Sequence, residues 1–532
     1  MADENATLTD VATVPPGRAD AAADARARGD ANAPKSVLLF SRVDFAWLYP
    51  LVMDRMRARY GTRFTVVVPH EKWRAHYAAH CGPRDRILCS ADVEDEARRA
   101  PLDEAEAYAT AARNERRLGL VYLRDVVQQA RSVSARYLRY APNSPHSWQA
   151  PPPWPELVKE VNHYVATFES LIEADRIDLV IERAGDLIST VSLHVAIARG
   201  IPTTFAVPSR YRSYAMWSFG PYLSGALLAR RYDGIGEVAA VAPESLRAPD
   251  DSRGNFARAA ALRSPANLAK AVLAATRDHA QWTIGDIVRR RRAQRLRYRD
   301  ILRYLFARWR IARWLDRIVE RDLARIAARP FVLFLLQFEP EYTTLSLARR
   351  FNDTAAVIRQ LALALPADVA LVVKENVNSI GNRRLGFYQD LCRLPNVTLA
   401  DHRIPGVELI ARTRAVATVS STGAVEANLL GKPAVIFAQD VEFAFLPHVI
   451  QLSDLSTLPA VLAEAVRERS EAEAETIRRE GARYRRALAE LSFDAAGTRP
   501  FRGTATTIPD DQLDRAVDLL VETAAAQTEP AR

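Results

Sequence analysis

Cysteine is scarce in this chain of 532 residues, and its three cysteines lie scattered at Cys81, Cys89 and Cys392. Thiols without pairing or metal-like spacing suit a reducing compartment, so we expect a cytoplasmic protein. No run of eighteen apolar residues occurs, which argues against a membrane-spanning helix. The N-terminal residues lack the apolar core of a signal peptide, so no secretory signal is expected.

Several signatures of catalytic chemistry are also missing. The chain contains no D-x-D or H-E-x-x-H motif and no pair of cysteines at metal-binding spacing. It also lacks the G-x-x-x-x-G-K-[ST] loop and the G-x-G-x-x-G fingerprint, which argues against ATPase and dinucleotide chemistry. We therefore expect no bound metal and no cofactor.

The length allows two or three domains, and the hydrophobic content of 48% is ordinary for a globular protein. Residues 1–34 carry almost no large apolar side chain after Val14, so we expect a disordered tail. Apolar runs then alternate with helix-like segments in two separate regions, which predicts an α/β fold with two Rossmann-like domains. The predicted units are an acceptor-side domain over 35–235, a linker and basic helical segment over 236–329, a nucleotide-binding domain over 330–455 and C-terminal helices over 456–532.

The strands follow from the apolar runs. In the first domain we expect strands at 36–40, 64–68, 178–181 and 203–207, with a short strand near 119–122. In the second domain we expect strands at 331–336, 369–373, 397–399, 415–419 and 434–437, with helices near 348–364, 383–393, 405–412 and 423–430. Regular alternation of this kind implies a parallel sheet with right-handed crossovers.

The stretch 415–439 is the most informative part of the chain. An apolar strand is followed by Ser420, Ser421, Thr422 and Gly423, and then by a helix of small residues that carries Glu426. Free backbone N–H groups and the helix dipole make such a turn a good seat for phosphate, and Glu426 could accept from a ribose hydroxyl. The alternative is an ordinary helix that Ser or Thr caps.

The same stretch resembles the donor-side motif of the capsule polysaccharide biosynthesis family. This bacterial group of glycosyltransferase-like proteins includes the Kdo transferases of capsule linkers. Three further segments fit in the same order: an apolar strand and a Q-P-E-like turn at 331–344, a V-K-E, G-x-R and P-N-V pattern from Ala370 onward, and Phe445-Leu446-Pro447. The resemblance covers roughly residues 330–452. The chain departs from the family at Glu339, where Gln is usual, and at Asn376-Val377, where the family has His-Pro.

The resemblance implies a metal-independent glycosyltransferase of GT-B architecture, whose C-terminal helices cross back onto the first domain. The donor would be a nucleotide sugar, foremost CMP-Kdo, and the acceptor would be a capsular polysaccharide or glycolipid. The open alternatives are a glycerophosphate-type polymer transferase and a non-catalytic GT-B-like assembly component. The expected donor-binding residues are Lys374, Glu375, Asn376, Ser420, Ser421, Thr422, Gly423 and Glu426.

Carboxylates at strand ends supply the catalytic candidates. Glu339 and Glu341 follow the first strand of the second domain, where one could orient the donor and the other act near the anomeric carbon. In the first domain, Asp44 and Asp186, with Glu182, follow strands at the edge where ligands bind. Asp44 and Asp186 could equally cap the helices that follow them. Lys374 could equally form a surface ion pair with Glu375 or Glu341.

Two groups of arginines offer further candidate binding sites. Arg210 and Arg212 follow a strand of the first domain and could bind a phosphate or a sugar carboxylate, or simply face water. Residues 289–317 hold twelve arginines against two aspartates, with aromatic side chains between them. A basic, aromatic helix can lie on an anionic membrane, which would place the protein on the inner face of the inner membrane. The alternative is a helix that packs an apolar stripe and leaves its arginines in water; nucleic acid is not expected as a partner.

Overall fold

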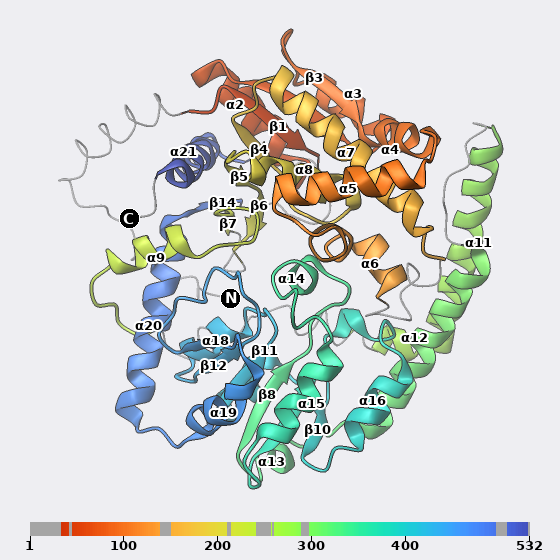
Figure 1. Cartoon of the computed structure of the whole chain (residues 1–532). Coiled ribbons are helices and arrows are strands. Elements are labelled where there is room, and N and C mark those ends of the chain that lie inside the picture. The colour runs from red at the N-terminus through yellow and green to blue at the C-terminus, as the bar shows by residue number, and fades with distance from the viewer. Residues whose placement is uncertain are drawn as a thin grey trace, which may run out of the picture.

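The computed structural model describes residues 33–41, 45–138, 150–209, 214–240, 257, 260–288, 297–495 and 508–529. Two α/β domains lie one above the other (Figure 1), with the N-terminal domain in red to yellow and the C-terminal domain in green to blue. Residues 1–32 of the expected tail lie outside the described residues. Among the residues described, no helix combines the length and apolarity needed to cross a membrane.

The N-terminal domain is built on a five-stranded parallel sheet in the order β3-β2-β1-β4-β5. Its central strand is completely buried, because every residue of the apolar run SVLLF faces a layer of helices. Leu39 packs with α2 on one face, and Leu38 packs with α7 on the other. The strands are β1 (Ser36–Phe40), β2 (Arg63–Val68), β3 (Arg86–Cys89), β4 (Leu179–Ile181) and β5 (Thr203–Thr204). The helices are α2 (Leu48–Tyr60), α3 (Glu71–Ala78), α4 (Ser90–Arg99), α5 (Glu104–Leu118), α6 (Arg131–Tyr137), α7 (Trp154–Ala174) and α8 (Leu187–Ala198).

Two sequence predictions for this domain are wrong. The expected strand near 119–122 does not form: α5 ends at Gly119, which takes a positive φ of 64°, and a π-helix, η2, follows over Tyr122–Val127. The expected strand 203–207 breaks after Thr204, and β6 (Ala206–Pro208) turns into a separate sheet. There it pairs antiparallel with β7 (Tyr214–Trp217), which pairs with β14 (Ser492–Asp494) from the end of the chain.

The C-terminal domain contains a six-stranded parallel sheet in the order β10-β9-β8-β11-β12-β13. In both sheets the first strand of the domain lies beside its fourth, which is the Rossmann order and creates a topological switch point between them. The strands are β8 (Phe331–Leu335), β9 (Ala370–Lys374), β10 (Val397–Ala400), β11 (Ala415–Thr418), β12 (Ala434–Ile436) and β13 (Val449–Gln451), the last of which the sequence did not predict. The helices are α14 (Tyr342–Leu345), α15 (Thr354–Ala364), α16 (Leu385–Cys392), α17 (Gly406–Arg412), α18 (Gly423–Leu429) and α19 (Leu458–Val466).

The segment between the domains is helical, with α9 (Ala226–Asp233), α11 (Pro265–Val288), α12 (Tyr298–Ile318) and α13 (Leu323–Ile326). Helix α12 packs on the C-terminal domain through Ile311, Ala312 and Leu315, which are all buried. Arg308 crosses directly over Gly381, where φ is +94° and an added Cβ would lie 2.1 Å from the Arg308 Cγ. Only glycine therefore allows the helix to approach so closely.

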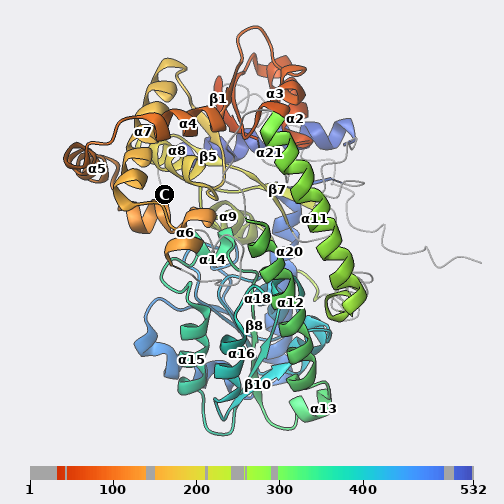
Figure 2. The ribbon, with the colours of Figure 1, turned by 90° about the vertical axis from the view of Figure 1, so that its right-hand side faces the viewer.

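The last helices tie the two domains together, as the resemblance implies. Helix α20 (Glu471–Glu490) packs against α18 of the C-terminal domain and α9 of the linker, and β14 then enters the small sheet with β7. Helix α21 (Asp510–Thr528) lies against α2, where Arg55 and Arg59 pair with its aspartates. The indole of Trp217 donates to the Ala516 carbonyl at 2.7 Å. Two Rossmann-like domains with returning C-terminal helices form the GT-B architecture, which confirms the predicted fold class (Figure 2).

Candidate functional site

The carboxyl ends of the two sheets face each other, and Tyr342 lies where they meet. Tyr342 follows β8 in the C-terminal domain, and its hydroxyl donates to the Pro221 carbonyl at 2.5 Å. The Arg183 guanidinium, just beyond β4, lies 5.4 Å from the centre of the Tyr342 ring. The Phe205 ring, beyond β5, meets the same ring edge-on at 5.6 Å. Ligands of open α/β sheets bind at these carboxyl ends, so the contact marks the candidate site.

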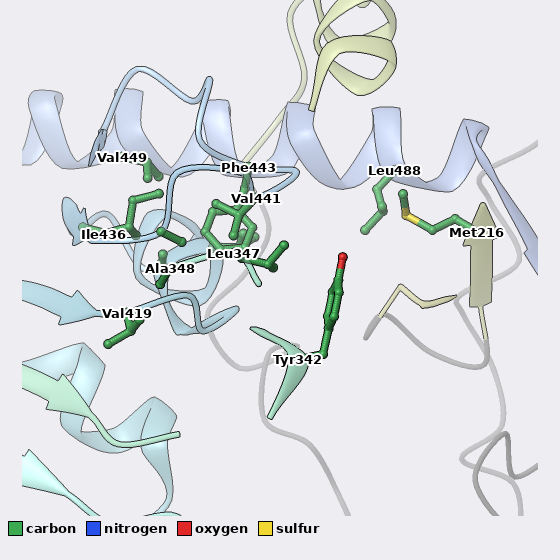
Figure 3. Close-up of a cluster of buried hydrophobic side chains, with 14 of the residues drawn as sticks. Met216, Tyr342, Leu347, Ala348, Val419, Ile436, Val441, Phe443, Val449 and Leu488 are labelled. Carbon is green, nitrogen blue, oxygen red and sulfur yellow. The ribbon is translucent and has the colours of Figure 1, made fainter. Parts of the chain in front are cut away.

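Buried apolar side chains form the floor of this region (Figure 3). Leu347, Val441 and Phe443 of the C-terminal domain lie to one side of Tyr342, and Met216 and Leu488 lie to the other. Met216 belongs to β7 and Leu488 to α20, so elements far apart in the sequence share one core. The two domains therefore pack against each other through this cluster.

The serine turn lies at the predicted place, above the switch point between β8 and β11. The buried Ser420 hydroxyl accepts from the Gln337 side chain at 2.8 Å and donates to the Thr343 carbonyl at 3.1 Å. Ser420 thus fastens its own turn to the loop after β8. The Ser421 hydroxyl accepts from the Gly423 N–H at 3.2 Å, whereas the Thr422 side chain makes no capping bond. Ser421 and Thr422 are half-buried and remain the accessible hydroxyls of the turn.

The helix after this turn contributes less to an anion site than the sequence suggested. Helix α18 has seven residues, so few aligned peptide dipoles support its N-terminus. Gly423 is needed for another reason, because an added Cβ would lie 2.3 Å from the Leu335 Cδ1 of the first strand. The main attraction for an anion must therefore come from a nearby side-chain charge, because the Ser421 and Gly423 N–H groups already donate to the hydroxyls of Thr418 and Ser421.

Lys374 supplies that charge at the end of the neighbouring strand β9. Its Nζ donates to the His402 carbonyl at 3.2 Å. Burial lowers the Lys374 pKa from its ordinary value, and the carboxylates of Glu375, Asp401 and Glu426 oppose that shift. The Glu426 side chain, on α18, is exposed. A lysine, an accessible serine turn and a glutamate therefore share one edge of the sheet.

His402 is a buried member of this edge that the sequence analysis did not single out. It follows β10 and is 3% exposed. Burial lowers its pKa to about 4, and Asp401 opposes the change. The imidazole is consequently neutral at physiological pH. The sequence signal for it was weak, since a single His after a strand carries no motif.

Glu339 and Glu375 turn inward and form a buried ion network. The Arg383 guanidinium lies 2.8 Å from Glu375 Oε1 and 3.2 Å from Glu339 Oε2. The Tyr388 hydroxyl donates to Glu375 Oε2 at 2.6 Å, and Thr354 donates to Glu339. Burial raises the Glu339 pKa, while Arg383 acts against it. These two carboxylates thus hold the loops after β8 and β9 in place.

The neighbouring candidates have different environments. The Asn376 side chain accepts from the Asn378 N–H at 3.0 Å and so caps the short helix η5 (Val377–Ser379). The Glu341 side chain is half-buried and accepts from the Thr343 hydroxyl at 3.2 Å. Of the three glutamates predicted from the strand ends of this domain, Glu341 is the more accessible, and its catalytic role stays a prediction.

The N-terminal domain offers two described carboxylates beyond β4. Asp186 caps α8, where its side chain accepts from the Ser189 N–H at 2.9 Å. Glu182 is buried and accepts from the Arg183 N–H at 2.8 Å. The capping alternative is therefore observed for Asp186, and its role as a base stays a prediction. Asp44, Arg210 and Arg212 lie outside the described residues.

A polar cluster between the domains also escaped the sequence analysis. His194 Nε2, on α8, lies 2.9 Å from the Asp125 carbonyl and 3.3 Å from the Tyr222 hydroxyl. The Arg349 guanidinium of the C-terminal domain stacks over the Tyr222 ring at 4.6 Å, and Gln128 donates to the Arg349 carbonyl at 2.7 Å. These residues come from four distant segments, so no local pattern could have grouped them.

Among the described residues, one group has the geometry to hold a metal ion: Glu71, Cys89 and Asp92. It lies at β3, the edge strand of the N-terminal sheet, and Glu71 already pairs with Arg74 at 2.8 Å. It takes no part in the site described above.

The chain matches no protein-family model and no curated protein sequence. Among solved structures, it is similar to KpsC, a β-Kdo 2,4-transferase from Thermosulfurimonas dismutans, with 13% identity, a TM-score of 0.31, and coverage of 64% of this chain and 87% of that one. It is also similar to a UDP-GlcNAc 2-epimerase from Methanocaldococcus jannaschii, with 11% identity, a TM-score of 0.23, and coverage of 85% and 99%. TM-scores this low do not indicate a function.

Proposed function

We propose that this protein is a glycosyltransferase that uses a nucleotide sugar as donor. The observation that carries the proposal is the carboxyl edge of the C-terminal sheet. There the Ser421 turn follows β11, Lys374 ends β9, and Glu426 lies near enough to Lys374 to raise its pKa. A phosphate needs hydrogen-bond donors, such as hydroxyls, and a positive charge, and a ribose needs a carboxylate acceptor. All three are present on one edge.

The proposed reaction divides its work between the two domains. An acceptor hydroxyl oxygen attacks the anomeric carbon of the donor while the bond from that carbon to the phosphate oxygen breaks. Lys374 and the hydroxyls of Ser421 and Thr422 would stabilise the leaving phosphate, and Glu426 would hold the ribose. A carboxylate on the facing domain, Asp44 or Asp186, would take the hydroxyl proton, and Glu341 would act near the anomeric carbon.

The finer identity of the substrates rests on the resemblance of residues 330–452. It supports a CMP-Kdo-like donor and a capsular polysaccharide or glycolipid acceptor at the cytoplasmic face of the membrane. The reaction would need no metal, because Lys374 and the loop would carry the leaving-group charge. A glycerophosphate-type transferase would use the same phosphate seat.

A non-catalytic binding or assembly role is the second candidate. It is favoured by Asn376-Val377, which replaces the family's His-Pro, and by the burial of Glu339 and Glu375 in structural ion pairs. Both observations remove groups that a transferase of this family would direct at its donor.

Nucleotide binding tests the proposal. We would measure thermal unfolding with CMP, CDP, UDP and GDP in the absence of metal. A ligand at a hundred times its dissociation constant adds about 2.7 kcal/mol of stability, which is a visible rise in midpoint. The expected result is a response to one nucleotide that is lost in Glu426→Gln and weakened in Ser421→Ala. The exposed Glu468→Gln, on another surface, should respond like the parent protein.

The remaining outcomes separate the candidates. A nucleotide response together with sugar release from the matching nucleotide sugar supports the transferase. A response without any transfer to polysaccharide or glycolipid acceptors supports the binding role. No response to any of the four nucleotides would contradict a donor site at this edge.

A further inference from the structure

Helix α12 carries a straight stripe of exposed arginines on one face. The exposed residues recur at intervals of four and three, which places them within one narrow arc of an α-helix. They span about 27 Å along the helix axis. We call them the arginine stripe: Arg299, Arg303, Phe306, Arg310, Arg313 and Arg317. Phe306, in its middle, is 52% exposed.

The opposite face of α12 fixes the direction of the stripe. Ile311, Ala312 and Leu315 are buried against the C-terminal domain. The Arg308 Nε donates to the Ile380 carbonyl at 2.8 Å, and the Trp314 ring lies 6.5 Å from the ring of Tyr388. The helix therefore cannot rotate its charged face inward. Helix α12 therefore packs an apolar stripe and leaves its arginines exposed, as the second sequence alternative expects; membrane binding stays a prediction.

Two hollows flank the arginine stripe and extend its charge. A groove of about 630 Å³ lies between α12 and α16, and its lining includes Arg303, Phe306, Arg310 and Arg384. A second hollow, of about 410 Å³, is lined by Arg263, Arg313, Asp316 and Arg317. Asp316 already pairs with Arg263, Arg321 and Arg403, so it cannot neutralise the stripe as well. Five exposed arginines thus follow one another along the helix, and Asp300, which lies 3.7 Å from Arg299, is the other acidic residue of α12 beside them.

The adjacent helix α11 adds apolar surface beside this charge. It packs along α12 and stands at the edge of the molecule (Figure 1). None of its described side chains, over residues 265–281, is buried, and Leu273 is 71% exposed. A helix that leaves so much of its surface uncovered suits contact with a further surface.

We propose that the arginine stripe docks this protein on a membrane surface rich in anionic phospholipid. The stripe is about 27 Å long, so it matches an extended anionic surface better than a single small anion. Arginines attract phosphate headgroups, and Phe306 can insert at the headgroup level. The proposal is independent of the donor site, which lies at the sheet edges. Docking would bring the site to lipid-linked molecules.

Vesicle binding tests the docking. The full-length protein is sedimented with vesicles of phosphatidylcholine, with and without phosphatidylglycerol. We expect binding to the anionic vesicles alone, and weaker binding as salt rises. Each arginine near such a surface raises the affinity about fivefold. The double variant Arg303→Gln/Arg310→Gln should therefore bind the anionic vesicles about 30-fold more weakly. Phe306→Ser should weaken binding without any change of charge.

A matched control removes the same charge elsewhere. Arg325 and Arg393 lie off the stripe, and their side chains are 76% and 78% exposed. The variant Arg325→Gln with Arg393→Gln should bind anionic vesicles like the parent protein. The stripe variant should keep its thermal response to nucleotide, which separates this proposal from that of the donor site.

Three outcomes would overturn the proposal. Equal binding to neutral and anionic vesicles would show that the charge plays no part. An equal loss in the stripe and control variants would show only an effect of net charge. Binding of single-stranded RNA or an anionic polysaccharide through the stripe, without vesicle binding, would assign the surface to another class of partner.

Discussion

The guanidinium of Arg383 donates to both carboxylate oxygens of Glu375, at 2.8 and 3.0 Å, with both side chains buried. The same guanidinium also donates to the Gln337 carbonyl at 2.7 Å. Gln337 in turn holds the Ser420 turn. One buried arginine thus connects the loops that follow three neighbouring strands, β9, β8 and β11, including the serine turn.

Removing Arg383 should therefore lower the free energy of unfolding of the C-terminal domain. Arg383→Met would leave Glu339 and Glu375 as buried carboxylates without their partner, which typically costs about 3–5 kcal/mol. Denaturant unfolding followed by circular dichroism measures the loss. The adjacent exposed Arg384→Met should stay within about 0.5 kcal/mol of the parent protein. Similar losses in the two variants would refute the role given to the network.

The sequence predicted the general arrangement of the C-terminal domain but not the directions of its side chains. The β11 strand, the serine turn and Glu426 occur where the apolar pattern and the turn residues indicate. Glu339 and Glu375 follow strands as predicted, yet they turn inward because Arg383 supplies a buried positive charge. No local pattern shows that, since the partner lies eight residues from one glutamate and forty-four from the other.

Tertiary contacts explain the errors in the N-terminal domain. The apolar run 203–207 reads as one strand, but its second half leaves the sheet to pair with β7, which then pairs with β14 from residues 492–494. A pairing across nearly three hundred residues leaves no local signal. The spacing of arginines in α12 was visible in the sequence, whereas the direction of the arginine stripe depends on which face Ile311 and Leu315 bury.

We expect the protein to lose stability as the pH falls, in part because of His402. Burial lowers its pKa to about 4 from the ordinary value of 6.5, so the unfolded chain binds a proton that the folded chain refuses. His402 therefore opposes folding progressively as the pH falls from 6.5 towards 4, by an amount on the order of 3 kcal/mol, and has no such effect above this range. His194, whose pKa burial also lowers, acts in the same direction.

The unfolding free energy measured across this range checks the prediction. His402→Gln loses ring packing at every pH, so the informative quantity is the slope and not the absolute stability. The parent protein should lose stability more steeply than the variant between pH 6.5 and 4. Parallel curves would show that the folded protein accepts a proton on His402 as easily as the unfolded chain does.

Tyr342 should couple the stability of the two domains. Its hydroxyl donates to the Pro221 carbonyl, and its ring contacts Phe205 and Arg183 of the other domain. Tyr342→Phe leaves the Pro221 carbonyl without its donor and should cost about 1–3 kcal/mol. Tyr342→Ala also empties the contact with Phe205 and Arg183, which raises the expected cost to about 3–5 kcal/mol. Unfolding followed both by tryptophan fluorescence and by circular dichroism measures these losses.

Because Tyr342 lies between the sheets, the alanine variant should also separate the unfolding of the two domains into two transitions. A single transition at the parent's midpoint would show that α20 and α21 alone hold the domains together.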